Sequence, residues 1–258
     1  MRDRYTGPKH SNAMPFHALG LAPALAQAAA DLGFTTPTPI QEAAVPAVLS
    51  GGDVLATAQT GSGKTAAYVL PLLQRLAAGP GHTPRRVRAL VLVPTRELAA
   101  QVGEVVRSLA QHLPTKTKTA VVFGGVSINP QMLALRGGAD VVVATPGRLL
   151  DLVEHNALKL ASVELLVLDE ADRLLDLGFA DELARVLALQ PAVRQNLFFS
   201  ATFPPAVQAL ANTLLREPQR LYVPSIEVEE AVVLQQAYVV DSTRRTQLLR
   251  QLIKTQGW

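Results

Sequence analysis

Six short apolar runs recur along this chain, and most of them end in a small or polar residue. A continuous apolar run of four to eight residues is typical of a strand buried on both faces of a sheet. Longer stretches with helical spacing lie between the runs, at 96–113 and 147–158, and after the last run, at 204–215. The alternation predicts a three-layer α/β fold, a parallel sheet with helices on both faces. The six runs are 53–58, 89–94, 119–123, 140–145, 165–169 and 196–200.

The composition narrows the class of protein. The chain has 258 residues, of which 48% are hydrophobic and 17% charged, as in a globular protein of one domain, or of one domain plus a fragment. It has no cysteine for a disulfide framework or a thiolate metal site. No stretch approaches a membrane span, and Arg2 is not followed by the apolar core of a signal peptide, so we expect a cytoplasmic protein without a membrane segment. The five histidines lack metal-ligand spacing and are expected at the surface: His10, His17, His82, His112 and His155.

Three segments divide the chain. Residues 1–13 are polar, and Ser11-Asn12-Ala13 resembles the scar of a cleaved tag, although a native extension is an equal alternative. Residues 14–224 hold all six runs and form the main predicted domain. Residues 225–258 combine a linker-like stretch with an alternating strand pattern at 236–240 and a helical pattern at 243–254. We expect them to be a linker and the start of a truncated second domain.

The basic residues gather in connecting segments, although the net charge is only +3. Such clusters are more often solvated faces than binding patches, so they permit a nucleic-acid partner without indicating one. Nothing in the sequence requires more than a monomer. The clusters are Arg85, Arg86 and Arg88; Lys116 and Lys118; and Arg244, Arg245, Arg250 and Lys254.

The segment after the first run carries the strongest motif. In a parallel sheet, ligands bind beyond the carboxyl ends of the strands. Glycines here let the backbone turn tightly so that its N–H groups point at phosphates, Lys64 can reach the β- and γ-phosphates, and the Thr65 hydroxyl can bind magnesium. The motif therefore predicts a nucleoside-triphosphate site, with Ala58 where the general pattern has glycine. Its residues are Ala58, Gln59, Thr60, Gly61, Ser62, Gly63, Lys64 and Thr65.

Two carboxylates follow the fifth run. Asp169 can bind a magnesium ion, and Glu170 can orient or deprotonate an attacking water. An acidic pair after a strand is often only the start of a helix. Combined with the loop at Lys64, it favours hydrolysis of a nucleoside triphosphate by Lys64, Thr65, Asp169 and Glu170.

The residues 169–172 spell Asp-Glu-Ala-Asp, and the chain resembles the DEAD-box ATP-dependent RNA helicases of the bacterial type. That family also has alanine at the position of Ala58. The resemblance covers about residues 16–258 and implies a RecA-like N-terminal domain. The other matching segments are 33–41, 94–99, 124–125, 145–148 and 200–202.

The resemblance also implies an adenine pocket. Gln41 would hydrogen-bond the adenine edge, because an amide offers a donor beside an acceptor. Phe16 would stack on the ring, and Phe34 would help to frame the pocket. Taken alone, residues 37–41 read as a proline-punctuated loop that leads into a helix.

A third set of residues is implied to contact the RNA backbone. Loops and helix starts after apolar runs can present N–H groups, hydroxyls and guanidinium groups to phosphates, so binding would tolerate any sequence and weaken with salt. Taken alone, residues 145–148 are as readily a strand-to-helix turn. The set is Pro94, Thr95, Arg96, Gly124, Gly125, Thr145, Pro146, Gly147 and Arg148.

A last set is implied to couple the ATP state to strand separation. The hydroxyls of Ser200 and Thr202 should face Asp172 across the sheet edge. A compatible alternative is that they cap a helix that begins near Pro204.

These expectations combine into one function. The parent protein would be an ATP-dependent RNA helicase that uses ATP and Mg²⁺, and this chain its ATP-binding and partly RNA-binding half. A second RecA-like domain in cis would complete it, so the isolated fragment should be nearly inactive. Two alternatives are a non-catalytic module that binds ATP or RNA, and a DNA helicase or translocase with the same core.

Overall fold

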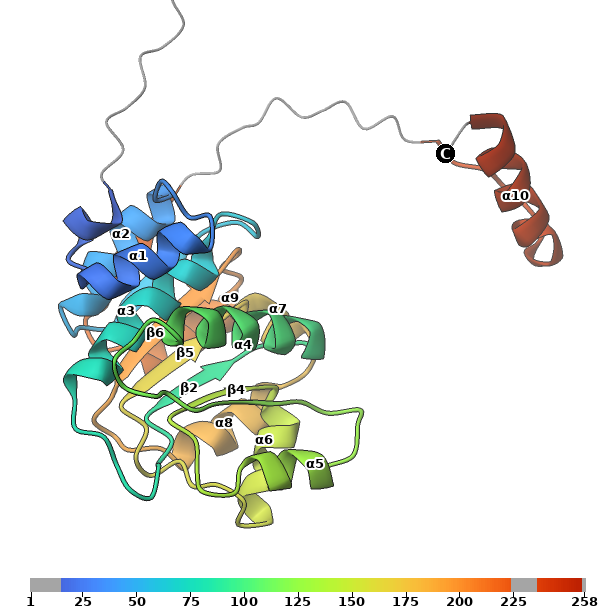
Figure 1. Cartoon of the computed structure of the whole chain (residues 1–258). Helices are drawn as coiled ribbons and strands as arrows, with labels where there is room; N and C mark the ends of the chain where they lie inside the picture. The colour runs from blue at the N-terminus through green and yellow to red at the C-terminus, as the bar shows by residue number, and fades with distance from the viewer. Residues whose placement is uncertain (1–14, 224–235, 257–258) are drawn as a thin grey trace, which may run out of the picture. The chain divides into compact units, whose positions relative to one another are not determined.

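The computed structural model describes residues 15–223 and 236–256. The chain divides into two compact units, Met1–Pro224 and Ser225–Trp258, which are described separately (Figure 1). The predictions for residues 1–13 and for the linker at 225–230 fall outside the described residues.

The first unit is built on a seven-stranded parallel sheet in the order β3-β4-β2-β5-β6-β1-β7. All six predicted runs form strands, but β7 was not predicted. Only Leu221 of β7 is buried, because β7 lies at the edge of the sheet, so it lacks a continuous apolar run. The strands are β1 (Val54–Thr57), β2 (Ala89–Leu92), β3 (Thr119–Val122), β4 (Val141–Ala144), β5 (Leu165–Leu168), β6 (Gln195–Ser200) and β7 (Gln219–Tyr222).

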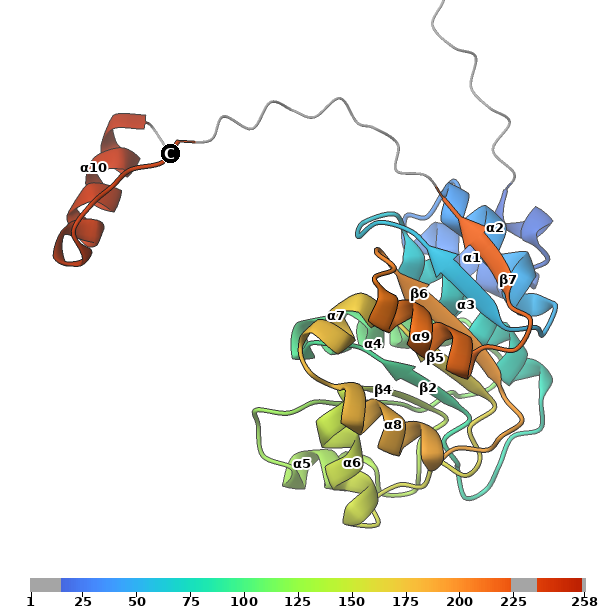
Figure 2. The same cartoon turned by 180° about the vertical axis from the view of Figure 1, so that it is seen from behind.

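Helices cover both faces of this sheet, as Figures 1 and 2 show. Ala56 and Phe199 pack into the core on one face, whereas Leu55 and Phe198 pack into the core on the other. The three-layer prediction is therefore confirmed. One face carries η1 (Phe16–Leu19), α1 (Pro23–Asp31), α2 (Pro39–Leu49), α3 (Lys64–Ala78) and α4 (Arg96–Ala110). The other carries α5 (Asn129–Ala134), α6 (Pro146–Glu154), α7 (Ala171–Asp176), α8 (Ala180–Ala188) and α9 (Pro205–Leu214).

One arginine of the basic clusters belongs to the interior, which corrects the expectation of a solvated face. Arg88 is only 5% exposed. Its Nε and Nη2 donate to both carboxylate oxygens of Glu164, at 2.7 and 2.9 Å, and its Nη1 donates to the carbonyl of Leu76 at 2.9 Å. Arg88 therefore links the end of α3 to the start of β5.

The second unit contains η2 (Ser242–Arg244) and α10 (Arg245–Gln256). The predicted helix at 243–254 is confirmed, whereas the strand predicted at 236–240 is wrong. A strand needs a neighbour for its ladder of hydrogen bonds, and the described residues of this unit offer none. Across both described ranges, no helix is long and apolar enough to cross a membrane.

Candidate nucleotide and nucleic-acid sites

The predicted phosphate loop connects the end of β1 to the start of α3. Gly61 and Gly63 have φ values of 82° and 93°, in the left-handed region that glycine adopts without strain. The buried Lys64 donates from Nζ to the carbonyl of Ala58 at 3.1 Å, which closes the loop on itself. The N–H of Ala58 donates to the carbonyl of Ser200 at 3.2 Å and holds the loop against β6. A tight loop at the start of a 15-residue helix presents N–H groups to an anion.

Asp169 lies directly beyond β5 and is only 2% exposed. Its Oδ1 accepts from the N–H of Glu170, and its Oδ2 accepts from the hydroxyl of Tyr68, both at 2.9 Å. Burial raises the pKa of Asp169, and the positive charge of Lys64 opposes that rise. Burial, followed by the charge of Asp169, raises the pKa of Tyr68 well above its ordinary value. The site thus contains a buried anion beside a buried cation.

Two side chains of this site belong to none of the motifs identified in the sequence. Tyr68 is fully buried in α3, and a hydroxyl within an otherwise apolar helical stretch was the available signal, because such a group needs a partner. Arg173 donates from Nη1 to Oε2 of the buried Glu170 at 2.8 Å. The i,i+3 spacing on α7 was the signal for that pair.

The oxygen donors at this site fit a magnesium ion. Asp169 supplies a carboxylate and the half-buried Thr65 a hydroxyl, and Mg²⁺ prefers hard oxygen ligands. The described residues contain no group of three His, Cys, Asp or Glu side chains that could hold a metal. An ion bound here would therefore depend on phosphate oxygens and water, which is the usual way that Mg²⁺ binds with a nucleotide.

Gln41 joins the start of α2 to the phosphate loop. Its Oε1 accepts from the N–H of Thr38 at 3.0 Å, and its Nε2 donates to the carbonyl of Gly63 at 3.1 Å. A Cβ atom at Gly63 would lie 2.5 Å from that Nε2, so only glycine permits the approach. The structure therefore brings the predicted adenine-binding amide against the predicted phosphate loop.

The two predicted aromatic residues are less accessible than the adenine pocket requires. Phe16 lies in η1 and is 5% exposed within the hydrophobic core. Phe34 is half-buried and packs against the same core. Their stacking and framing roles stay predictions, and the burial of Phe16 leaves little of its ring free for a base.

The three predicted coupling residues form one network beyond β5 and β6. The N–H of Asp172 donates to Oγ of Ser200 at 3.2 Å. The N–H and hydroxyl of Thr202 donate to Oδ2 of Asp172 at 2.9 and 2.8 Å. Neither hydroxyl caps α9, because its N-cap is Pro204 and has no side-chain cap hydrogen bond. Burial raises the pKa of Asp172, but the hydrogen bonds to its carboxylate together outweigh burial, so the pKa is lowered.

The predicted RNA contacts lie beyond β2, β3 and β4, three strands that are neighbours in the sheet. Thr95 caps α4 by accepting from the N–H of Leu98 at 3.2 Å. The N–H of Gly124 donates to Oγ1 of Thr145 at 3.4 Å, so the loops after β3 and β4 touch. The predicted residues therefore share one edge of the sheet with the phosphate loop.

These residues differ in how far they face solvent. Arg96 is exposed and pairs with Glu97, whereas Thr145 and Pro146 are buried. The side chain of Arg148 is only 10% exposed and donates from Nη2 to the carbonyl of Val126 at 2.7 Å. Arg148 thus holds the loop after β3 in place, and Arg96 is the more accessible cation.

Comparison with known proteins agrees with this geometry. The sequence pattern of the DEAD/DEAH box helicase family matches residues 38–210. The chain belongs to the DEAD/DEAH box helicases. It is 39% identical to the DEAD-box ATP-dependent RNA helicase RhpA of Helicobacter pylori strain B128 over 242 residues, which cover 94% of this chain and 48% of that protein. It is 44% identical to the ATP-dependent RNA helicase DbpA of Escherichia coli strain K12 over 223 residues, which cover 86% and 48%.

A solved structure shows the same fold. A DEAD box protein from Methanococcus jannaschii matches with a TM-score of 0.74 and 33% identity, over 94% of this chain and 64% of that one. The chain spans about half the length of the curated DEAD-box relatives RhpA and DbpA.

Proposed function

We propose that this chain is the ATP-binding half of an ATP-dependent RNA helicase. One observation carries the proposal: the phosphate loop, the Asp169–Glu170 pair and Gln41 converge at the carboxyl edge of one parallel sheet, where they can surround a single nucleotide. The matching relatives from Helicobacter pylori and Escherichia coli are named ATP-dependent RNA helicases.

The residues divide the work of phosphoryl transfer. The N–H groups of the loop bind the phosphates, and Lys64 exchanges the Ala58 carbonyl for a phosphate oxygen. Asp169 and Thr65 would hold a magnesium ion, which when bound neutralises phosphate charge. Glu170, held by Arg173, orients the attacking water and accepts its proton. Gln41 selects adenine through its amide, beside the loop that binds the phosphates.

The exposed groups after β2 and β3 bind the sugar-phosphate backbone of RNA. Arg148 supports the loop after β3. Binding should tolerate any base sequence and weaken with salt. Because the chain spans about half of its relatives, we infer that a second RecA-like domain in cis completes the RNA site and the ATP site. The isolated chain should then bind nucleotide yet show negligible RNA-stimulated ATPase activity.

Calorimetry with Mg²⁺ tests the proposal by comparing ADP, ATP and GDP. ADP should bind more tightly than GDP, and Gln41→Ala and Lys64→Ala should each weaken ADP binding at least tenfold. Lys159→Ala is the matched control, because this exposed lysine lies beyond the opposite ends of the strands. Equal affinity for ADP and GDP, or full affinity in Lys64→Ala, would contradict the proposed nucleotide site.

A further inference from the structure

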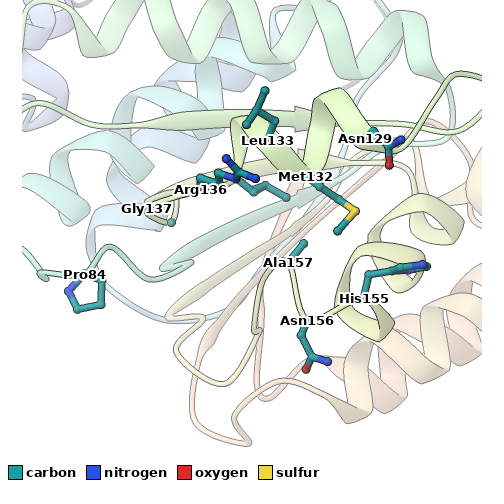
Figure 3. Close-up of a pocket in the computed structure, with 11 residues that line it drawn as sticks. Pro84, Asn129, Met132, Leu133, Arg136, Gly137, His155, Asn156 and Ala157 are labelled. Atoms are coloured by element: carbon teal, nitrogen blue, oxygen red, sulfur yellow. The ribbon is translucent and has the colours of Figure 1, made fainter.

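The first unit has a hollow that lies away from the phosphate loop. A pocket of about 640 Å³ opens beside α5 and the turn after α6, and it is lined by Pro84, Met132, Arg136 and Asn156, among others (Figure 3). A second hollow of about 460 Å³ adjoins it and shares the residues Gly138, Asn156 and Ala157. Their linings include the segments before β2, β4 and β5, so the two hollows, here called the amino-edge pocket, lie at the amino ends of the strands.

The floor of the amino-edge pocket is held in place by close packing. A Cβ atom at Gly138 would overlap the carbonyl of Arg85, so the segments before β2 and β4 touch there. Nε of Arg85 pairs with Oδ2 of Asp140 at 3.0 Å, and the N–H of Lys118 donates to the same oxygen at 2.7 Å. The pocket is therefore formed before any ligand arrives, as small binding sites usually are.

The rim of the pocket carries unsatisfied positive charge. Arg86, Arg136 and Lys159 are exposed, and none of them makes an ion pair with another described residue. Two carboxylates that adjoin lining residues in the sequence already pair with other arginines. These pairs are Asp140 with Arg85 and Glu154 with Arg185.

The lining of the pocket includes apolar side chains, and one of them can adjust its shape. Met132 points toward the turn at 155–157 in Figure 3, and Leu133, which also lines the pocket, is 58% exposed. Methionine adapts to ligands of different shapes. His155 is the sole ring system in the lining other than a proline, so the described walls offer no Phe, Tyr or Trp platform of the kind on which single-stranded nucleic acid stacks.

We propose that the amino-edge pocket binds an acidic peptide segment of a partner protein, with an apolar side chain in the hollow and carboxylates on Arg86, Arg136 and Lys159. An apolar anchor within a polar rim is the usual arrangement of a peptide site. Because the nucleotide loop and the predicted RNA contacts lie at the opposite ends of the strands, the partner binds together with ATP and RNA. The pocket can thus recruit the enzyme to a complex without blocking its reaction.

Fluorescence anisotropy of the whole chain with a labelled peptide of repeating Glu-Glu-Leu tests the proposal. Saturable binding is expected, and Arg136→Glu and Lys159→Glu should each raise the Kd at least fivefold. Arg220→Glu is the control, because Arg220 is also exposed but lies on β7 at the far edge of the sheet. ADP affinity should be unchanged in all three variants, which separates this test from that of the nucleotide site.

Four outcomes would overturn the proposal. One is the absence of saturable binding, and another is an equal loss of binding in Arg220→Glu. The third is unchanged affinity for a peptide in which every leucine is replaced by glycine, since that would show attraction by charge alone. The fourth is a single-stranded oligouridine that binds as tightly as the peptide and no longer binds to Arg136→Glu and Lys159→Glu. That result would assign the surface to RNA instead.

Discussion

The hydroxyl of Tyr68 donates a 2.9 Å hydrogen bond to Oδ2 of Asp169, and both groups are buried. The bond joins α3, which begins at the phosphate loop, to the end of β5. With Oδ1 held by the N–H of Glu170, the Asp169 carboxylate cannot rotate freely. Tyr68 is therefore a positioning residue for the carboxylate that we expect to bind magnesium.

Tyr68→Phe tests that role, because phenylalanine keeps the ring and removes only the hydroxyl. The Asp169 carboxylate should then lose its fixed orientation, and the gain in ADP affinity on adding Mg²⁺ should fall about fivefold, or roughly 1 kcal/mol. ADP affinity without metal should stay unchanged. Calorimetry with and without Mg²⁺ measures both values, and Tyr222→Phe, at an exposed position on β7, is the control. An unchanged metal effect would show that the bond serves packing alone.

The sequence predicted most of the fold because buried parallel strands leave a continuous apolar run, and six such runs became strands. Edge strand β7 left no such run, since only Leu221 is buried. Residues 236–240 have the alternation of a strand but no partner strand among the described residues, so the pattern alone misled. Local patterns thus predict elements whose burial is complete, and they fail where pairing depends on a neighbour.

The same distinction applies to the site. The network of Asp172, Ser200 and Thr202 was expected because each residue belongs to a recognisable motif. The bond between Tyr68 and Asp169 spans 101 residues and belongs to none. Arg88 looked like part of a surface cluster, and its burial follows from the position of Glu164, which no local pattern encodes.

Gly63→Ala should disrupt the contact between the phosphate loop and Gln41. The new Cβ would lie 2.5 Å from Nε2 of Gln41, and the φ of 93° adds backbone strain. Gly61→Ala is a matched control, because its φ of 82° imposes similar strain but no atom lies within 4 Å of its Cβ. Gly63→Ala should lower the free energy of unfolding by about 1 kcal/mol more than Gly61→Ala. Urea unfolding without nucleotide measures the difference, and equal losses would contradict the steric argument.

Arg88→Met should destabilise the domain, because Arg88 lies in the interior. It removes two hydrogen bonds to Glu164 and one to the carbonyl of Leu76, which then lacks that partner. The expected loss is about 2–3 kcal/mol, moderated because the Glu164 side chain is 47% exposed and can be solvated. Arg86→Met, at an exposed position two residues away, should change the unfolding free energy by less than about 0.5 kcal/mol. Comparable losses in thermal or urea unfolding would place Arg88 at the surface.

Asp172→Asn should lower stability in a manner that depends on pH. Hydrogen bonds from Thr202, Arg173 and Ser200 outweigh burial and lower the pKa of Asp172. The charged carboxylate therefore stabilises the folded chain above its unfolded pKa of about 3.9, and this contribution is lost as the pH falls through the lower folded value. At pH 7 the variant should lose about 1–2 kcal/mol, because asparagine replaces charge-assisted bonds with neutral ones.

Urea unfolding of both proteins at pH 7 and in steps below about pH 4 checks this dependence. The stability gap between Asp172→Asn and the unaltered chain should narrow over that range, because the carboxylate of the unaltered chain becomes protonated. Asp176→Asn controls for the loss of one negative charge, since Asp176 lies exposed in the same helix, α7. A gap that stays constant with pH would mean that the shape of the side chain, and not its charge, holds Thr202 against α7.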